Sequence, residues 1–151
     1  MTVWLDDREF DAWVTMLRAS VLLLQRLDEE LQEAHGLSLS DYEVLVQLSA
    51  APDGALRMSD LAERALVSKS RLTHAVDRLQ QAGLVDRQRC ETDRRGYFAV
   101  LTDLGRRRLE EAAPTHVAGV RRHLLAQGEP ADLDHVTRFL ARVAESLTAE
   151  R

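Results

Sequence analysis

Residues 84–104 read LVDRQRCETDRRGYFAVLTDL, and this segment carries the strongest structural signal in the chain. Apolar and polar residues alternate toward both of its ends, which is the two-residue period of β-strands. Between these runs, residues 91–96 are polar or glycine and favour a turn. The segment therefore predicts a β-hairpin with a basic tip, followed by a helix that opens at Thr102.

A helix is predicted directly before the hairpin, from Ser68 to Gln81, and Gly83 closes it. Ser68 is a good N-cap because its hydroxyl group can accept a bond from a first-turn amide. Apolar residues at helical spacing form a buried stripe, namely Leu72, Ala75, Val76 and Leu79. The opposite face carries short polar side chains and cations, namely Lys69, Ser70, Arg71, Thr73, His74 and Arg78. Such a face is most often only solvated, but it also suits contacts with base edges and phosphates.

Two more helices are predicted upstream. Residues 57–67 indicate a short helix capped by Ser59, and a very short turn joins it to Ser68, which is typical of a helix-turn-helix. Ser40 and Glu43 have the spacing of a capping box that opens the other helix. The order helix, helix, recognition helix, strand, wing, strand is that of a winged helix that reads DNA.

The tip of the hairpin holds Asp93, Arg94, Arg95 and Gly96. In isolation, such a tip would be an ordinary solvated loop. Beside a recognition helix, Arg94 or Arg95 can enter a minor groove, where the negative potential of DNA is focused. Asp93 would orient one guanidinium group through a charge-assisted pair. We therefore expect both arginines to contact DNA.

The chain resembles the MarR-type transcriptional regulators over nearly its whole length. The resemblance rests on LSDYEVL at residues 39–45, MSDLA at 58–62, GLVDR at 83–87, DRRG at 93–96 and VLTDLG at 100–105. The DRRG wing that leads into LTxxG is the most specific of these motifs. The resemblance implies a homodimer that binds pseudo-palindromic double-stranded DNA, usually represses transcription, and is often released by a small-molecule effector.

The distribution of charge agrees with one DNA-binding face. The net charge is −5 and the isoelectric point is near 5.5, which argues against a protein that coats nucleic acid in general. Residues 57–108 nevertheless hold twelve Lys or Arg against seven Asp or Glu, while the rest of the chain holds eight against eighteen. Positive charge is therefore concentrated in the predicted reading unit.

The two ends of the chain predict helices that pair with a second copy. Apolar residues recur at helical spacing from Phe10 to about Gly36, and again from Leu133 to Leu147. Between them, the helix that opens at Thr102 contains Pro114, which we expect to kink or interrupt it. The predicted fold is mainly α with a small β-hairpin wing. Residues 1–36 and 103–151 would form the dimerisation region of this single domain, and residues 37–102 the winged helix-turn-helix. The alternative is that the terminal helices pack only within their own monomer.

The resemblance also implies an effector pocket between the dimerisation helices and the reading unit. Plausible lining residues are Trp13, Met16, Leu17, Tyr42 and His116, which suit an aromatic or phenolic ligand. For Trp13 and Met16 an ordinary place in the core is the more frequent role of apolar residues at helical spacing. The sequence does not identify the ligand.

The single cysteine, Cys90, suggests an alternative function as a redox-sensing regulator, since nearby arginines could activate its thiol. In oxidant-sensing relatives, however, the reactive cysteine lies in the N-terminal helix, which here has none, so an inert Cys90 is favoured. A second alternative is a winged-helix protein-interaction module without specific DNA binding.

Other classes of function find no support in the sequence. The five histidines are dispersed, so no metal site is expected, and no phosphate-binding loop or nucleophile motif indicates an enzyme or a cofactor. No apolar run approaches the twenty or so residues of a membrane span, and the N-terminus lacks the features of a signal peptide. A cytoplasmic protein, associated with the nucleoid through DNA and without a membrane partner, is expected.

Overall fold

The computed structural model describes residues 3–65, 69–90 and 96–149. The chain divides into two compact units, residues 1–116 and 117–151. In the first unit the helices are α1 (Asp7–His35), α2 (Leu39–Ser49), α3 (Met58–Arg64) and α4 (Lys69–Gln81), with a short 3₁₀ turn at Pro52–Gly54. Its strands are β1 (Ala55–Arg57), β2 (Val85–Arg89) and β3 (Tyr97–Leu101). Helix α5 (Asp103–His123) begins in the first unit and ends in the second, which also holds a 3₁₀ turn (Leu125–Gln127) and α6 (Pro130–Ala149).

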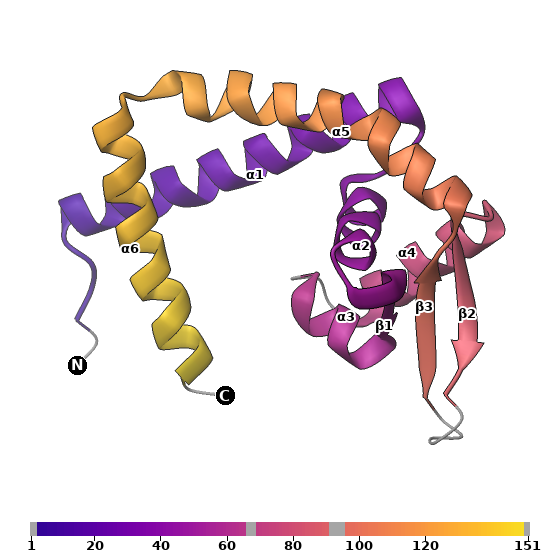
Figure 1. The fold of residues 1–151 in the computed structure, drawn as a ribbon. Helices are drawn as coiled ribbons and strands as arrows, with labels where there is room; N and C mark the ends of the chain where they lie inside the picture. The colour runs from indigo at the N-terminus through magenta and orange to yellow at the C-terminus, as the bar shows by residue number, and fades with distance from the viewer. Residues whose placement is uncertain (1–2, 66–68, 91–95, 150–151) are drawn as a thin grey trace. The chain divides into compact units, whose positions relative to one another are not determined.

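The wing is a three-stranded antiparallel sheet in the order β1-β3-β2 (Figure 1). Strands β2 and β3 form the predicted hairpin, with Val85 opposite Leu101 and Arg89 opposite Tyr97. The residues of β3 alternate as expected, since Ala99 and Leu101 are buried while Phe98 and Val100 are half-buried. Strand β1 is an addition that the sequence did not predict, because three residues are too short to show a period.

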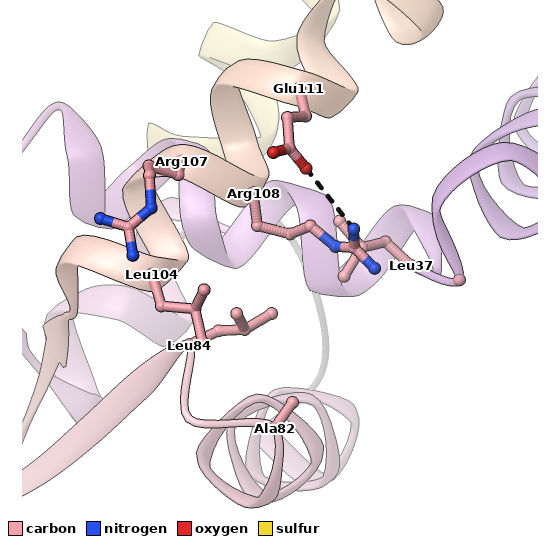
Figure 2. A pocket seen from close by; sticks show the side chains of 8 residues that line it. Leu37, Ala82, Leu84, Leu104, Arg107, Arg108 and Glu111 are labelled. Carbon is pink, nitrogen blue, oxygen red and sulfur yellow. Dashed lines mark hydrogen bonds and ion pairs between the residues drawn. The ribbon is translucent and has the colours of Figure 1, made fainter.

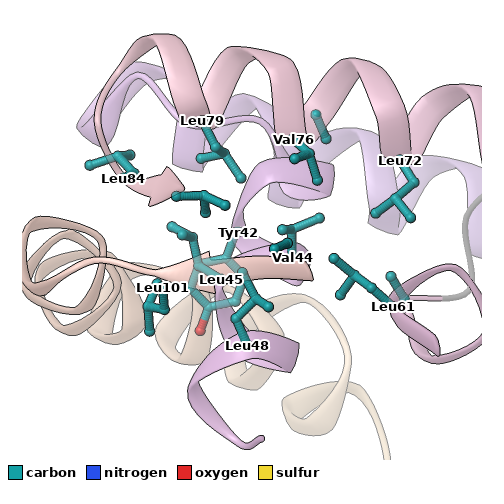
Figure 3. Packing of buried hydrophobic residues seen from close by; sticks show 14 of the residues in the cluster. Tyr42, Val44, Leu45, Leu48, Leu61, Leu72, Val76, Leu79, Leu84 and Leu101 are labelled. Carbon is teal, nitrogen blue, oxygen red and sulfur yellow. The ribbon is translucent and has the colours of Figure 1, made fainter. Parts of the chain in front are cut away.

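The core of the first unit forms between α2, α4 and the sheet. Figure 3 shows Leu72, Val76 and Leu79 of α4 pointing toward Val44 and Leu45 of α2, and all five side chains are buried. The buried stripe of α4 is therefore confirmed. Its burial fixes the orientation of the helix, so the polar face of α4 must point away from the core.

The end of α4 and the start of α5 are joined by a compact set of backbone contacts. Gly83 takes a left-handed conformation with φ of 70°, and the Leu84 amide donates to the Leu79 carbonyl at 2.9 Å, which closes α4. Thr102 caps α5, because its hydroxyl oxygen accepts from the Gly105 amide at 3.0 Å. The same hydroxyl group donates to the Gly83 carbonyl at 2.8 Å. The LTxxG motif thus locks α5 to the end of the recognition helix.

Two local predictions about helix caps were wrong. The capping box of α2 is formed by Ser38 and Asp41, not by Ser40 and Glu43, so the helix starts earlier than expected. Ser59 does not cap α3, because it lies inside the first turn, where its hydroxyl group donates to Asp60 at 3.0 Å.

Pro114 does not interrupt α5, which continues from Asp103 to His123, while the expected kink stays a prediction. Pro114 and Glu110 are both exposed, so water can reach the carbonyl group that the proline leaves without a donor.

The fold class is confirmed: the protein is mainly α with a small antiparallel wing. The predicted division of the chain at residues 36 and 102 stays a prediction. In the second unit, α6 presents large apolar side chains to solvent, namely Val136, Phe139, Leu140, Val143 and Leu147. Among the described residues, no helix is both long enough and apolar enough to cross a lipid bilayer.

Candidate nucleic-acid interface

The exposed face of α4 is the centre of the candidate interface. Ser70, Arg71, Thr73 and His74 are all exposed on the first half of this helix. The opposite stripe anchors the helix in the core, so these side chains are carried on a rigid element. A short helix face with small donors and one guanidinium group has the composition that major-groove contacts require.

Arg78, at the other end of this face, has a structural partner. Its guanidinium group donates to the buried Asp41 carboxylate at 2.7 Å, and also lies 3.4 Å from the Ser38 hydroxyl group. Asp41 in turn accepts from the Ser38 amide at 3.2 Å, as part of the α2 capping box. Arg78 therefore ties α4 to the start of α2. Its DNA contact stays a prediction, and this pairing competes with it.

A second ion pair ties α4 to the wing. Asp77 of α4 accepts from Arg87 of β2 at 2.6 Å. The two residues are ten positions apart, so neither helix nor strand periodicity could have identified the pair. Asp77 and Arg78 are adjacent and are held by different neighbours, which fixes the rotation of the helix about its axis.

Arg57 holds the part of the wing that lies toward the hairpin tip. Its guanidinium group lies over the Phe98 ring, 5.5 Å from the ring centroid, and donates to the Cys90 sulfur at 3.3 Å. The Cys90 amide donates to the Gly96 carbonyl at 2.9 Å, which continues the hairpin one step beyond the Arg89–Tyr97 pair toward its tip. Cys90 itself is only 8% exposed, so an oxidant would reach its thiol poorly.

Some of the predicted DNA-binding residues are not covered by the structure. Ser68, Arg94 and Arg95 lie outside the described residues, as does the side chain of Lys69. Their contacts with DNA stay predictions.

The candidate effector residues form two groups in one chain. Tyr42 and His116 lie together, with ring centroids 4.5 Å apart. Trp13, Met16 and Leu17 lie on the part of α1 that precedes its buried residues Leu27 and Leu31. At about 1.5 Å per residue, Trp13 is roughly 21 Å along the helix from Leu27, and the role of these residues in an effector pocket stays a prediction.

Burial shifts the pKa values of both Tyr42 and His116. Burial lowers the pKa of His116, although the nearby Glu43 carboxylate opposes this effect. Burial also raises the pKa of Tyr42, and Glu43 raises it further. The Nδ1 atom of His116 is buried and has no hydrogen-bond partner in the part of the chain that the structure describes. A buried polar atom of this kind is a candidate contact for a water molecule or a ligand.

A helix-turn-helix with an exposed polar recognition helix and an adjacent three-stranded wing defines a winged-helix regulator. A sequence model of the MarR family matches residues 35–96. The HTH-type transcriptional repressor MdtR of Bacillus subtilis (strain 168) is 32% identical over 127 residues, which are 82% of this chain and 82% of that protein. The chain therefore belongs to the MarR family of transcriptional regulators.

Solved structures agree over almost the whole chain. AbsC, a MarR family regulator from Streptomyces coelicolor, is 46% identical with a TM-score of 0.90, and the match covers 98% of this chain and 99% of AbsC. Sco3205 from the same organism, solved in complex with DNA, is 38% identical with a TM-score of 0.91, and the match covers 97% and 92%. The family consists of DNA-binding regulators and not of enzymes, as the sequence predicted.

Proposed function

We propose that this protein is a homodimer that binds a pseudo-palindromic operator and represses transcription until a small molecule releases it. The observation that carries the DNA-binding part is the exposed polar face of α4, which the buried stripe and two ion pairs hold beside the wing. Ser70, Arg71, Thr73 and His74 would contact base edges and phosphates in the major groove. Arg94 or Arg95 would enter the flanking minor groove. Such a regulator works in the cytoplasm, at the nucleoid.

The homodimer is supported by exposed apolar side chains on two helices. In the first unit, α1 exposes Phe10, Trp13, Val14, Leu17, Val21 and Leu24. In the second unit, α6 exposes the five large apolar residues named above. A monomer in water rarely exposes apolar stripes of this length, and a second copy of the chain would cover them.

Repression and release are supported by two relatives and by one side-chain pair of this chain. One relative, MdtR, is a repressor by name, and a solved structural neighbour is described as a regulator whose DNA binding responds to 6-hydroxynicotinic acid. In this chain, the buried Tyr42 and the half-buried His116 offer an aromatic wall and one buried nitrogen atom without a described partner. An aromatic or phenolic effector would suit that environment.

The test is fluorescence anisotropy of the purified protein on DNA from upstream of its own gene, against a shuffled duplex. We expect preferential binding with two protomers per site. Arg71→Ala should weaken specific binding about tenfold or more, since a good base contact contributes 1–3 kcal/mol. Arg94→Ala should weaken it as well and lower the salt dependence by about one unit of slope.

Arg106→Ala is the matched control, because Arg106 is an exposed arginine on α5, outside the candidate interface. It should bind the operator like the unmodified protein. Equal weak binding to both duplexes would point to a distant operator or to a protein-interaction module. Selection from fragmented genomic DNA separates these outcomes, because a module without specific DNA binding enriches no site.

A further inference from the structure

The start of α2 is the point where side chains from α1 and α4 meet. From α1, the half-buried Asp28 carboxylate accepts from the Leu39 amide at 2.7 Å. From α4, the Arg78 guanidinium group donates to the Asp41 carboxylate at 2.7 Å and lies 3.4 Å from the Ser38 hydroxyl group. Leu39 is the first residue of α2, and Ser38 is its N-cap. Three helices are therefore joined at one helix end, within the first unit.

These contacts hold the start of α2 from two sides. The first amides of a helix have no acceptor within that helix, and the Asp28 carboxylate supplies one for Leu39 from another helix. A charged acceptor makes this bond stronger than one between neutral groups. Asp41, on the side of α4, is only 6% exposed, so solvent screens its carboxylate poorly.

The connection between α1 and α2 is packed as well. Leu37 is 5% exposed, and it lines a small depression together with Leu84 and Leu104 (Figure 2). The residue before Ser38 is therefore fixed in the core, and the short connection is not a free hinge.

Helix α1 links this junction to the apolar surface assigned above to the dimer. Its first part carries the exposed apolar side chains from Phe10 to Leu24. Its last part is anchored in the first unit, because Leu27 and Leu31 are buried. Figure 1 shows α1 as one continuous helix that leads into α2. The same helix thus reaches from the proposed dimer surface to the helix end that Arg78 also contacts.

We propose that Asp28 and Arg78 are positioning residues that fix the distance and rotation between the two recognition helices of the dimer. The partner would hold the apolar part of each α1, so the junction at the start of α2 decides where α4 lies relative to the twofold axis. Half-sites one helical turn apart lie about 34 Å apart, so one base pair of spacing corresponds to about 3.4 Å and a tenth of a turn. The junction therefore determines which half-site spacing is read. This inference rests on the function proposed above.

The first experiment measures the distance between the two α4 helices in the absence of DNA, by double electron–electron resonance. The spin label is attached through Gln80→Cys, at an exposed position near the end of α4, in a full chain whose single native cysteine is removed by Cys90→Ser. We expect one narrow distance distribution. Asp28→Ala and Arg78→Met should each shift or broaden it by about 3 Å or more, which is the rise of one base pair. Since Arg78→Met reaches the junction from α4, the inference stays testable if Asp28→Ala fails to fold.

Two further variants separate positioning from a general loss of charge. Asp28→Asn keeps an oxygen atom that can accept from the Leu39 amide, so it should restore most of the narrow distribution. Glu33→Ala is the matched control, because it removes a carboxylate from an exposed position of the same helix, and it should change nothing. An unchanged distribution in Asp28→Ala or Arg78→Met, or equal effects at Asp28 and Glu33, would overturn the inference. An unmodified protein without a dipolar signal would contradict the proposed dimer, and the inference with it.

The second experiment tests whether the junction determines the spacing that is read. Anisotropy compares the operator with duplexes in which one base pair is inserted or removed between the half-sites. We expect the preference for the native spacing to fall at least about threefold in Asp28→Ala, which is near the lower end of coupling in a hydrogen-bonded network. A residue that only stabilises the fold or only contacts DNA would weaken binding to all three duplexes by the same factor, and that result would overturn the inference. A junction that fixes the distance in a protein without operator binding would contradict the proposed function instead.

Discussion

Gly105 shows how closely two backbone segments approach at the root of the wing. A Cβ atom built at this position would overlap the Leu84 carbonyl oxygen and would come within 2.8 Å of the Leu101 side chain. The Leu84 oxygen belongs to the backbone, so it cannot move aside as the end of a side chain could. The LTxxG motif therefore needs glycine at this position because the Leu84 backbone leaves no room for a Cβ atom. The chain does not turn there.

We predict that Gly105→Ala destabilises the protein by about 1–3 kcal/mol or more, because overpacking shifts backbone atoms. Urea denaturation followed by circular dichroism measures this change. Gly128→Ala is the control, because a Cβ atom there meets only Asp132, with its closest contacts at an ordinary 3.4 Å. If the two substitutions have equal effects, the close approach at Gly105 is not what stabilises this junction.

His116 predicts a pH dependence of stability. Its folded-state pKa is lowered from 6.5 by burial, so the unfolded chain binds the proton more readily. The stability that His116 contributes is thus complete above the unfolded pKa and is lost as the pH falls from about 6.5 toward the folded pKa. We expect His116→Phe, which keeps an aromatic ring against Tyr42, to lose less stability than the unmodified protein between about pH 7.5 and about pH 5.5. Unfolding at both pH values tests this, and parallel losses in the two proteins would contradict it.

At the scale of elements, α2 and α4 are joined by an apolar face and by one ion pair. Asp41 is buried and holds both the Ser38 amide and the Arg78 guanidinium group. Removal of this carboxylate leaves a helix cap and a cation without their acceptor. The pair thus connects the start of one helix with the orientation of the recognition helix.

A double-mutant cycle with Asp41→Asn and Arg78→Met measures this connection. We expect a coupling free energy of about 1 kcal/mol, because the Arg78 side chain is 52% exposed and solvent screens the pair. Arg78→Met should lower stability as well as operator affinity, whereas a residue that only contacts DNA would lower affinity alone. A coupling free energy near zero would mean that Asp41 does not hold Arg78 in solution. Arg78 would then be free to contact DNA, as the sequence predicted.

The elements with a clear period were predictable from the sequence, and the contacts between elements were not. The buried stripe of α4 and the strands of the hairpin follow from spacing, because each position on a regular element has a defined face. The pair of Asp41 and Arg78 spans 37 positions, and periodicity gives the face of a residue but not its partner. Two overlapping capping patterns begin at Ser38 and Ser40, and only the folded chain shows that the first is used.

At the scale of the whole molecule, the prediction about dimerisation concerns the exposed apolar face of α6. Leu140 lies near the middle of this face and is 44% exposed in the single chain. We predict that Leu140→Glu shifts the monomer–dimer equilibrium toward monomer by roughly a hundredfold or more, because a carboxylate in an apolar interface loses its hydration without a partner. Sedimentation velocity at micromolar concentration measures the shift.

Ala141→Glu is the matched control, because Ala141 is also exposed on α6 but lies to the side of the apolar stripe. It should remain as dimeric as the unmodified protein. The two recognition helices of a dimer read half-sites about 34 Å apart, so the monomeric Leu140→Glu form should also lose preference for the intact operator over a single half-site. A Leu140→Glu protein that stays dimeric would place the interface elsewhere. A monomeric form with unchanged operator preference would instead show that one protomer is enough to read the site.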